Sequence, residues 1–386
     1  MRQHLRKCSY IIVFKILIAV GCDGGSGRAP AIAAPSAGSS RLSELLRDDM
    51  QAGFPKATRV REFGFPLDHG PHPEYRNEWW YFTGNLDAET GGRFGFELTI
   101  FRFSLSAQAP EAAESAWRTN QVFIGHLAVT DAENRRFHVA QRYSRGAAGL
   151  AGATAMPAHI WLDDWSISTD EDTLWQLRAS DEEFAIALDL EPLKAVVLNG
   201  DRGLSQKSAE PGNASYYYSV PRLATRGVIT VDGDDVAVSG LSWLDREWGS
   251  SALARDQKGW DWFALQLSDG SDLMYYVLRG ANDAPDPHSS GTRINAEGTA
   301  TGLGLDDVSI TVTDYWESER GGRYPSGWEI DVPGEALSLR VTPILDDQEL
   351  VTNVRYWEGA VDVVGTSNGS PINGRGYVEL TGYASE

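Results

Sequence analysis

The segment Gly240-Leu-Ser-Trp-Leu-Asp-Arg-Glu-Trp-Gly249 combines two carboxylates with bulky apolar residues in a pattern that suits acid–base chemistry. Because side chains alternate between the faces of an extended strand, Trp243, Asp245 and Glu247 would share one face. An apolar wall would raise the pKa of Asp245 and keep it protonated, as a general acid requires, and the like charge of Glu247 would add to this effect. We therefore expect Asp245 to be a catalytic acid and Glu247 its partner. The alternative is that both carboxylates bind neighbouring arginines or cap a turn, because buried carboxylates are usually paired.

A second run, Glu78-Trp-Trp-Tyr-Phe82, also mixes a carboxylate with aromatic residues. By alternation Glu78 and Trp80 face one way and Tyr81 the other. The interior of a small β-barrel often holds one lipophilic ligand, and Glu78 would be the polar group that fixes its orientation. Glu97 lies in a similar strand-like segment and is given the same role. The alternative is a packed core in which Glu78 pairs with a nearby arginine.

Other motifs in the chain do not predict a cofactor. His69 and His72 have spacing that a metal could use, but they lie in a stiff Gly/Pro loop without further histidines to complete a site. We expect no metal there, and instead a hydrogen bond from His72 into the first barrel. Gly365-Thr-Ser-Asn-Gly369 matches G-x-S-x-G, yet turn residues rather than a helix follow it, so we expect no serine nucleophile. The sequence contains no P-loop, G-x-G-x-x-G or H-E-x-x-H motif, and we expect no cofactor.

Composition limits the kinds of partner. A chain of 386 residues exceeds a usual single domain, so two domains are expected. The formal net charge of −20 makes nucleic acid and anionic lipid headgroups poor partners. Cys8 and Cys22 are the only cysteines and both lie in the leader, so the body of the protein uses neither disulfides nor thiol catalysis.

The N-terminus predicts export. Basic residues precede an apolar stretch at 10–20 that is too short to span a membrane, so 1–22 reads as a signal peptide. Ile18-Ala-Val-Gly-Cys22 resembles a bacterial lipobox with Cys22 as the lipidated residue. The Gly/Ala/Ser/Pro-rich segment 23–53 would be a flexible tether. We expect a lipoprotein of the cell envelope facing the periplasm, the alternative being cleavage near Ala33 or Ala34 and secretion.

From Phe54 onward the chain reads as β-structure. A short helix is expected at 41–51, but no later stretch keeps a 3.6-residue period, and turn signals recur between strand-like runs. These features favour antiparallel barrels or sandwiches. The expected strands are 94–101, 122–129, 184–190, 227–231, 236–243, 260–267, 273–279, 308–313, 337–342, 357–364 and 376–383.

Four segments carry a resemblance to a known family. The run Trp243–Gly249 resembles a signature of the AttH/CrtC family, and three further segments resemble other parts of the same pattern. Those segments are His72–Gly84, Gly259–Leu267 and Gly374–Tyr383. The family comprises bacterial proteins with tandem lipocalin-like domains, including carotenoid 1,2-hydratases and many proteins known only as predicted secreted hydrolases. The resemblance implies an all-β chain of two lipocalin-like antiparallel β-barrels, at 54–250 and 251–386.

The resemblance also implies an activity. A hydratase of this type adds water to an isolated double bond, which needs an acid to protonate one carbon and a wall that tolerates a carbocation on the other. The rings of Trp243, Trp260 and Trp262 could stabilise that cation. We expect a hydratase or hydrolase acting on an isoprenoid-like or lipid-like ligand. The alternatives are a non-catalytic lipoprotein that binds or transfers a lipophile, accessory to an ABC transporter, and a cyclase that shapes its substrate.

Overall fold

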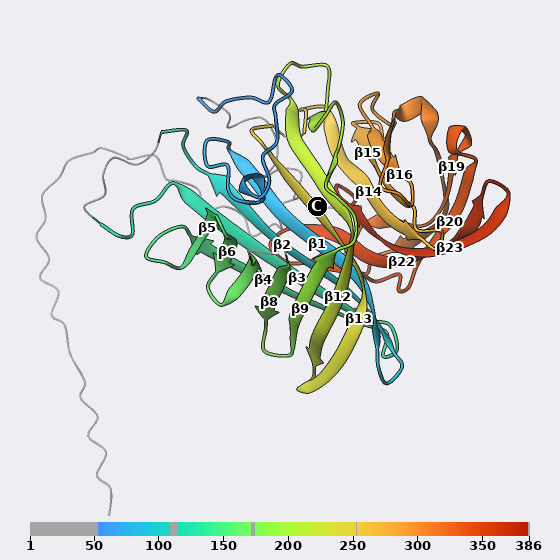
Figure 1. Cartoon of the computed structure of the whole chain (residues 1–386), viewed down its shortest axis with the longest axis horizontal. Helices are drawn as coiled ribbons and strands as arrows, with labels where there is room; N and C mark the ends of the chain where they lie inside the picture. The colour runs from blue at the N-terminus through green and yellow to red at the C-terminus, as the bar shows by residue number, and fades with distance from the viewer. Residues whose placement is uncertain (1–52, 109–114, 171–173, 252, 385–386) are drawn as a thin grey trace, which may run out of the picture. The chain divides into compact units, whose positions relative to one another are not determined.

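The computed structural model describes residues 53–108, 115–170, 174–251 and 253–384, and these form two antiparallel β-sheets (Figure 1). The expected signal peptide, Cys22, the helix at 41–51 and nearly all of the tether lie outside the described residues. Short 3-10 helices are the only helical elements described: η2 (Leu67–His69), η3 (Leu305–Asp307) and η4 (Pro333–Glu335). The prediction of an all-β chain is confirmed. No helix in the described part of the chain has the length and apolar character needed to cross a membrane.

The first sheet contains thirteen of the described strands and covers the sequence from Asn77 to Gly249. The strands are β1 (Asn77–Ala88), β2 (Arg93–Ser104), β3 (Gln121–Asp131), β4 (Arg136–Arg145), β5 (Ala151–Ala155), β6 (Ala158–Leu162), β7 (Trp165–Thr169), β8 (Trp175–Ser180), β9 (Phe184–Pro192), β10 (Val197–Leu198), β11 (Leu204–Gln206), β12 (Ala214–Val231) and β13 (Asp234–Gly249). Their order is β4-β3-β2-β1-β13-β12-β9-β8-β7-β6-β5, with β10 and β11 paired to β12. A Cβ on Gly125 of β3 would lie 2.7 Å from Leu162 of β6, so the sheet curls until its two ends meet.

The second sheet contains ten of the described strands and covers the sequence from Gln257 to Leu380. The strands are β14 (Gln257–Leu267), β15 (Asp272–Gly280), β16 (Ser290–Ile294), β17 (Ala300–Leu303), β18 (Ser309–Glu317), β19 (Arg323–Val332), β20 (Leu337–Pro343), β21 (Glu349–Val351), β22 (Arg355–Ser367) and β23 (Ser370–Leu380). Their order is β17-β16-β15-β14-β23-β22-β20-β19-β18, with β21 paired to β22.

Turn residues join the strands where the sequence predicts them. Asp232 and Gly233 have positive φ values of 53° and 87° and connect β12 to β13 as a two-residue hairpin. The segment 268–271 connects β14 to β15. In the G-x-S-x-G match, Asn368 and Gly369 form the turn between β22 and β23, which pair directly. A strand rather than a helix follows, so the match is not a nucleophile elbow.

Alternation along the strands separates an inner core from an outer layer. On β13, Leu244 and Trp248 belong to the core enclosed by the first sheet, whereas Trp243 belongs to a separate cluster. On β14, Phe263 belongs to the core of the second sheet, whereas Trp262 belongs to the same cluster as Trp243. The predicted period of two in the segment 240–249 is confirmed. Each sheet therefore buries one face within itself and uses its other face against the other sheet.

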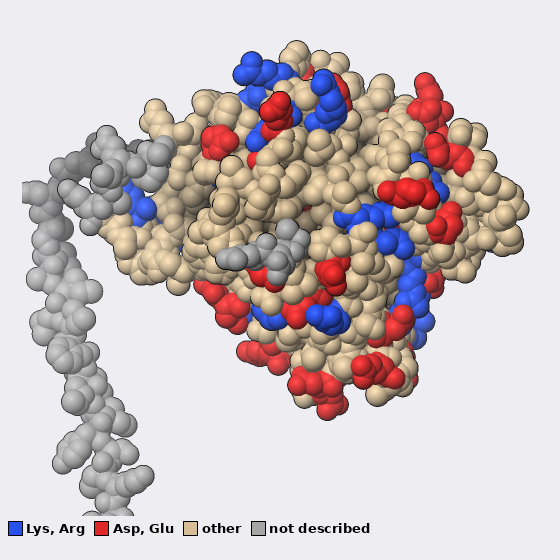
Figure 2. All heavy atoms as spheres, viewed as in Figure 1, with Lys and Arg blue, Asp and Glu red and all other residues tan. Residues whose placement is uncertain are grey.

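Polar contacts also join the two outer faces. The Tyr81 hydroxyl on β1 donates to Glu358 Oε2 on β22 at 2.9 Å. Lys194 Nζ, in the loop after β9, lies 2.7 Å from Asp272 on β15. A Cβ on Gly95 of β2 would lie 2.5 Å from the Cβ of Ala360, so this contact has no room for a larger residue. On the face shown in Figure 2, acidic and basic side chains are interspersed and form no extended basic patch.

Candidate functional site

A pocket lies between the outer faces of the two sheets. Aromatic and carboxylate side chains make up most of its wall, and Lys207 is the single basic side chain among its described lining residues. The lining residues are Trp79, Tyr81, Phe101, Lys207, Tyr217, Asp245, Glu247, Trp260, Trp262, Tyr276, Leu278, Glu358 and Glu379. Apolar pockets with a few convergent polar groups are the usual form of small-molecule sites.

Strand register brings the acidic groups to this pocket from both sheets. In the first sheet, Tyr81 of β1 lies opposite Asp245 of β13. In the second sheet, Trp262 of β14 lies opposite Glu379 of β23, and Glu379 in turn lies opposite Glu358 of β22. Side chains directly opposite each other on neighbouring strands share one face of the sheet. Each sheet therefore contributes one row of residues to the pocket.

Asp245 is held by three hydrogen-bond donors. Ser219 Oγ donates to Oδ1 at 2.5 Å, Trp243 Nε1 donates to the same oxygen at 2.7 Å, and the Tyr217 hydroxyl donates to Oδ2. The pKa of Asp245 is raised to about 6, mainly because the carboxyl group is buried. The three hydrogen bonds lower the pKa, and the charge of Glu247 raises it. Asp245 can therefore gain or lose a proton near neutral pH.

Glu247 forms a buried ion pair beside Asp245. Lys207 Nζ lies 3.2 Å from Glu247 Oε1, and Ser215 donates a hydrogen bond to the same oxygen. Burial alone would lower the pKa of Lys207, but the charge of Glu247 raises it above its usual value. Lys207 Nζ also lies 4.2 Å from the ring centroid of Tyr276, within cation–π range. This corner of the pocket therefore holds a cation between a carboxylate and an aromatic face.

Two carboxyl groups of the second sheet complete the wall. Burial raises the pKa of Glu379 to about 8, with a lowering hydrogen bond from Trp260 and a raising contribution from the charges of Asp245 and Glu247. Burial and the neighbouring carboxyls likewise hold the pKa of Glu358 well above its usual value. Glu379 is thus a carboxylic acid at neutral pH, and it lies at the pocket surface, half-buried.

The sequence-predicted residues separate into two groups. Asp245, Glu247, Tyr81, Trp260 and Trp262 all line the pocket. Trp243 is buried behind Asp245 and orients it through the indole N–H. Glu97 is fully buried and is not part of the pocket wall; burial raises its pKa, and the charge of Glu379 raises it further.

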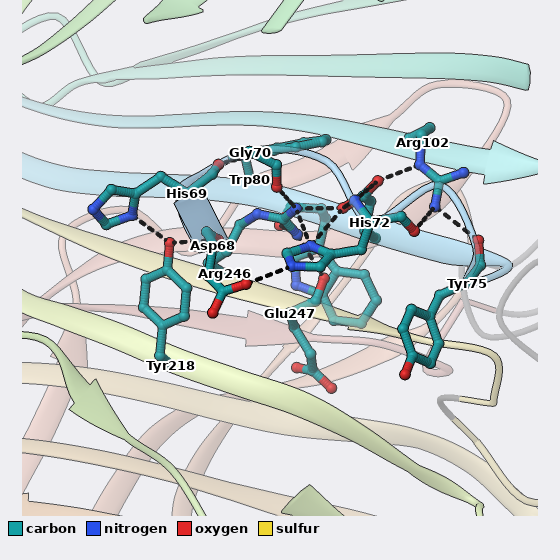
Figure 3. Close-up of polar contacts among 12 residues, drawn as sticks. Asp68, His69, Gly70, His72, Tyr75, Trp80, Arg102, Tyr218, Arg246 and Glu247 are labelled. Atoms are coloured by element: carbon teal, nitrogen blue, oxygen red, sulfur yellow. Dashed lines mark hydrogen bonds and ion pairs between the residues drawn. The ribbon is translucent and has the colours of Figure 1, made fainter. Parts of the chain in front are cut away.

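Glu78 and Trp80, predicted to bind the ligand, are not among the residues that line this pocket. They lie on the inner face of β1, where Glu78 accepts hydrogen bonds from Arg102, Arg246 and the backbone N–H of His72. The expected alternative, pairing with an arginine, is what the structure contains. In Figure 3, Arg246 and Arg102 lie on either side of His72 within this network. The buried guanidinium of Arg246 also stacks 3.9 Å from the ring centroid of Trp80.

The His69 and His72 loop closes the same inner network. His72 Nε2 lies 3.0 Å from Asp68 Oδ1, and its ring stacks on Trp248 with centroids 3.8 Å apart. His69 Nδ1 lies 2.7 Å from the Tyr218 hydroxyl (Figure 3). Among the described residues no group of three metal-binding side chains converges. Both histidines therefore connect the loop to the first sheet, as expected for His72.

Sequence reasoning missed several pocket residues. Glu379 lies inside the C-terminal segment Gly374–Tyr383, whose alternation places it on the same strand face as Tyr377. That alternation could have placed Glu379 on one strand face from the sequence, but it does not show what this face contacts. Lys207 lies in a loop between β11 and β12, where no periodic pattern exists.

This geometry defines a protein of two curled antiparallel sheets with an acidic, aromatic pocket between them. The chain belongs to the AttH-like family, whose model matches residues 56–383. A Nitrosomonas europaea protein described as an AttH is 34% identical, with a TM-score of 0.76 over 84% of this chain and 98% of its own. The predicted fold class, all-β with two lipocalin-like domains, is thereby confirmed.

More distant structures share the fold. Kievitone hydratase from Nectria haematococca is 16% identical, with a TM-score of 0.64 over 88% of this chain and 98% of its own. The protein CghA is 13% identical, with a TM-score of 0.50 over 88% of this chain and 97% of its own. No curated protein sequence matches this chain.

Proposed function

We propose that this protein is a hydratase that adds water to a carbon–carbon double bond of a lipophilic ligand held in the pocket between the sheets. The observation that carries the proposal is that two carboxyl groups in different surroundings line one aromatic pocket: Asp245, which accepts three hydrogen bonds, and Glu379, on the strand opposite Trp262. Pairs of titratable groups whose surroundings separate their pKa values are typical of an acid and a base. The shared fold with kievitone hydratase supports the same class of reaction.

We assign the acid role to Glu379 rather than to Asp245. Glu379 is protonated at neutral pH, whereas both oxygens of Asp245 already accept hydrogen bonds that favour its ionised form. Asp245 is better suited to accept a proton from water. Glu247 forms an ion pair with Lys207 beside Asp245, and its negative charge raises the pKa of Asp245. The sequence predicts Asp245 as the acid, and we instead assign it the role of the base.

The proposed reaction balances without a cofactor. The Glu379 O–H bond breaks as a C–H bond forms at one alkene carbon, leaving a cation on the other. The rings of Trp260 and Trp262 stabilise this cation. Water attacks it, forming the C–O bond, and Asp245 takes the proton that water loses. Solvent at the open mouth then returns a proton to Glu379 and accepts the one on Asp245.

The experiment that tests this function uses oxygen-18 water. The purified full-length protein is incubated with a panel of prenylated phenols, linear isoprenoids and isoprenoid amines, and the products are identified by mass spectrometry. We expect a product that gains one water containing oxygen-18. Ligand that binds but returns unchanged would support a lipophile carrier instead, and an oxygen-18 label in a released carboxylate would support a hydrolase.

We further propose that the chain is exported and anchored through a lipidated Cys22, which would bring the pocket close to membrane-derived ligands and to an ABC-transporter partner. The support is the lipobox-like sequence before Cys22. In protein purified from the cell envelope, we expect the N-terminal peptide to begin at Cys22. Its mass should be increased by the mass of three acyl chains. A Cys22→Ser variant should appear in the soluble fraction. An N-terminus at 34 or 35 without lipid would contradict the anchor.

A further inference from the structure

Both halves of the pocket contain carboxyl groups and aromatic rings, but only one half contains a described basic side chain. In one half Lys207 lies between Glu247 and the ring of Tyr276. In the other half Tyr81 donates a hydrogen bond to Glu358, Trp262 lies opposite Glu379, and no described lining residue there is basic. Aromatic faces and carboxylates both attract positive charge. The half without a lysine therefore repeats the surroundings of a bound cation.

Glu358 provides a separate observation that points to a ligand. Its side chain is fully buried and lines the pocket, and the Tyr81 hydroxyl donates to Oε2 at 2.9 Å. Its other oxygen, Oε1, has no hydrogen-bond partner among the described residues. Buried polar atoms are nearly always satisfied, and an unsatisfied one costs free energy. A donor brought by the ligand would satisfy Oε1.

The aromatic residues around Glu358 are arranged for a cation. Tyr81 and Trp262 both line the pocket and meet edge to face, with ring centroids 5.1 Å apart and planes at 89°. Trp262 lies on the strand next to Glu379, directly opposite it. Lys207 shows that this protein holds one cation in such a setting, 4.2 Å and 5.2 Å from two tyrosine rings.

We propose that the ligand of this pocket carries a protonated amine, which donates to Glu358 Oε1 beside Tyr81 and Trp262. The inference rests on the proposed function for the ligand pocket and for the double bond of the ligand, whereas the amine is argued from Glu358 alone. Glu358 would be ionised in the complex and its charge balanced by the ammonium group, so that Glu379 keeps its proton for the reaction. The ligand class is thus a lipophilic amine that also contains a double bond.

The test compares two probes of equal length, octylamine and 1-octanol, by calorimetry at neutral pH on the full chain. We expect octylamine, protonated in solution, to bind at least tenfold more tightly than the neutral alcohol, because charge-assisted contacts exceed neutral ones. In Glu358→Gln this preference should fall to less than about threefold. Glu329→Gln is the matched control, since Glu329 is exposed and paired with Arg340, and it should keep the full preference.

Each outcome is decisive. Equal binding of both probes to the folded wild type would overturn the amine inference and leave the proposed hydratase pocket intact. A preference for octylamine that survives in folded Glu358→Gln would also overturn it, because the ammonium would then bind elsewhere. Absence of binding by both probes, together with absence of oxygen-18 incorporation, would remove the proposed function as well.

Discussion

Replacing Glu379 with glutamine should lower the hydration rate by about 10²–10⁴-fold while ligand affinity changes little. Glutamine has nearly the same shape and can keep a hydrogen bond with Trp260, but it has no acidic proton to give to the alkene carbon. Because Glu379 lies at the pocket surface and half-buried, the variant should fold. The measurement is single-turnover product formation beside a direct binding titration. A rate within threefold of wild type would remove Glu379 from the reaction.

The pH dependence gives an independent check of the same assignment. Asp245 must be ionised to accept a proton, so activity should rise as the pH increases through about 6. Glu379 must be protonated, so activity should fall as the pH increases through about 8. The expected profile is a bell between these values. Asp245→Asn should remove the acid limb, and exposed Glu182→Gln should leave the profile unchanged.

The alternation in the segment 240–249 could be predicted from the sequence because a strand has only two faces. The face with Trp243, Asp245 and Glu247 forms as expected, and the opposite residues fill the inner core. Sequence could not show what that face contacts. That face lines a pocket together with Glu358 and Glu379, more than 100 residues later in the chain, and this depends on how two separate sheets pack.

The same limit applies to Glu78 and Trp80. Both faces of β1 are buried, so hydrophobicity alone does not distinguish the core face from the pocket face. Sequence alternation places Tyr81 and Glu78 on opposite faces of the strand, as in the structure, but it does not show that the face of Tyr81 lines the pocket. The interior of the first sheet is instead filled by large side chains such as Trp165 and Trp175.

Replacing Glu78 with glutamine should reduce the free energy of unfolding by about 3–5 kcal/mol. The change keeps the volume of the side chain but leaves the guanidinium groups of Arg102 and Arg246 buried without a counter-charge. The measurement is the midpoint of urea denaturation, with exposed Glu182→Gln as control. A loss below 1 kcal/mol would mean that backbone carbonyls alone satisfy the two arginines.

The pH dependence of this stability has a defined sign. Burial alone would raise the pKa of Glu78, but Arg102 and Arg246 lower it well below its usual value of 4.5. A depressed pKa means that the stabilising contribution is complete at neutral pH and decreases as the pH falls below about 4.5. The difference in stability between wild type and Glu78→Gln should therefore be constant near pH 7 and shrink on acidification.

A triple variant separates the cost of an unpaired charge from the value of the network itself. Glu78→Leu combined with Arg102→Met and Arg246→Met removes all three charges, so it should be less destabilised than Glu78→Gln. Arg246 lies between Asp245 and Glu247 on β13 and donates to the backbone carbonyl of Gly70 at 2.7 Å. The triple variant should therefore fold yet lose activity, because this anchor fixes the strand that places both pocket carboxylates. Full activity in a folded triple variant would show that the inner network contributes stability alone.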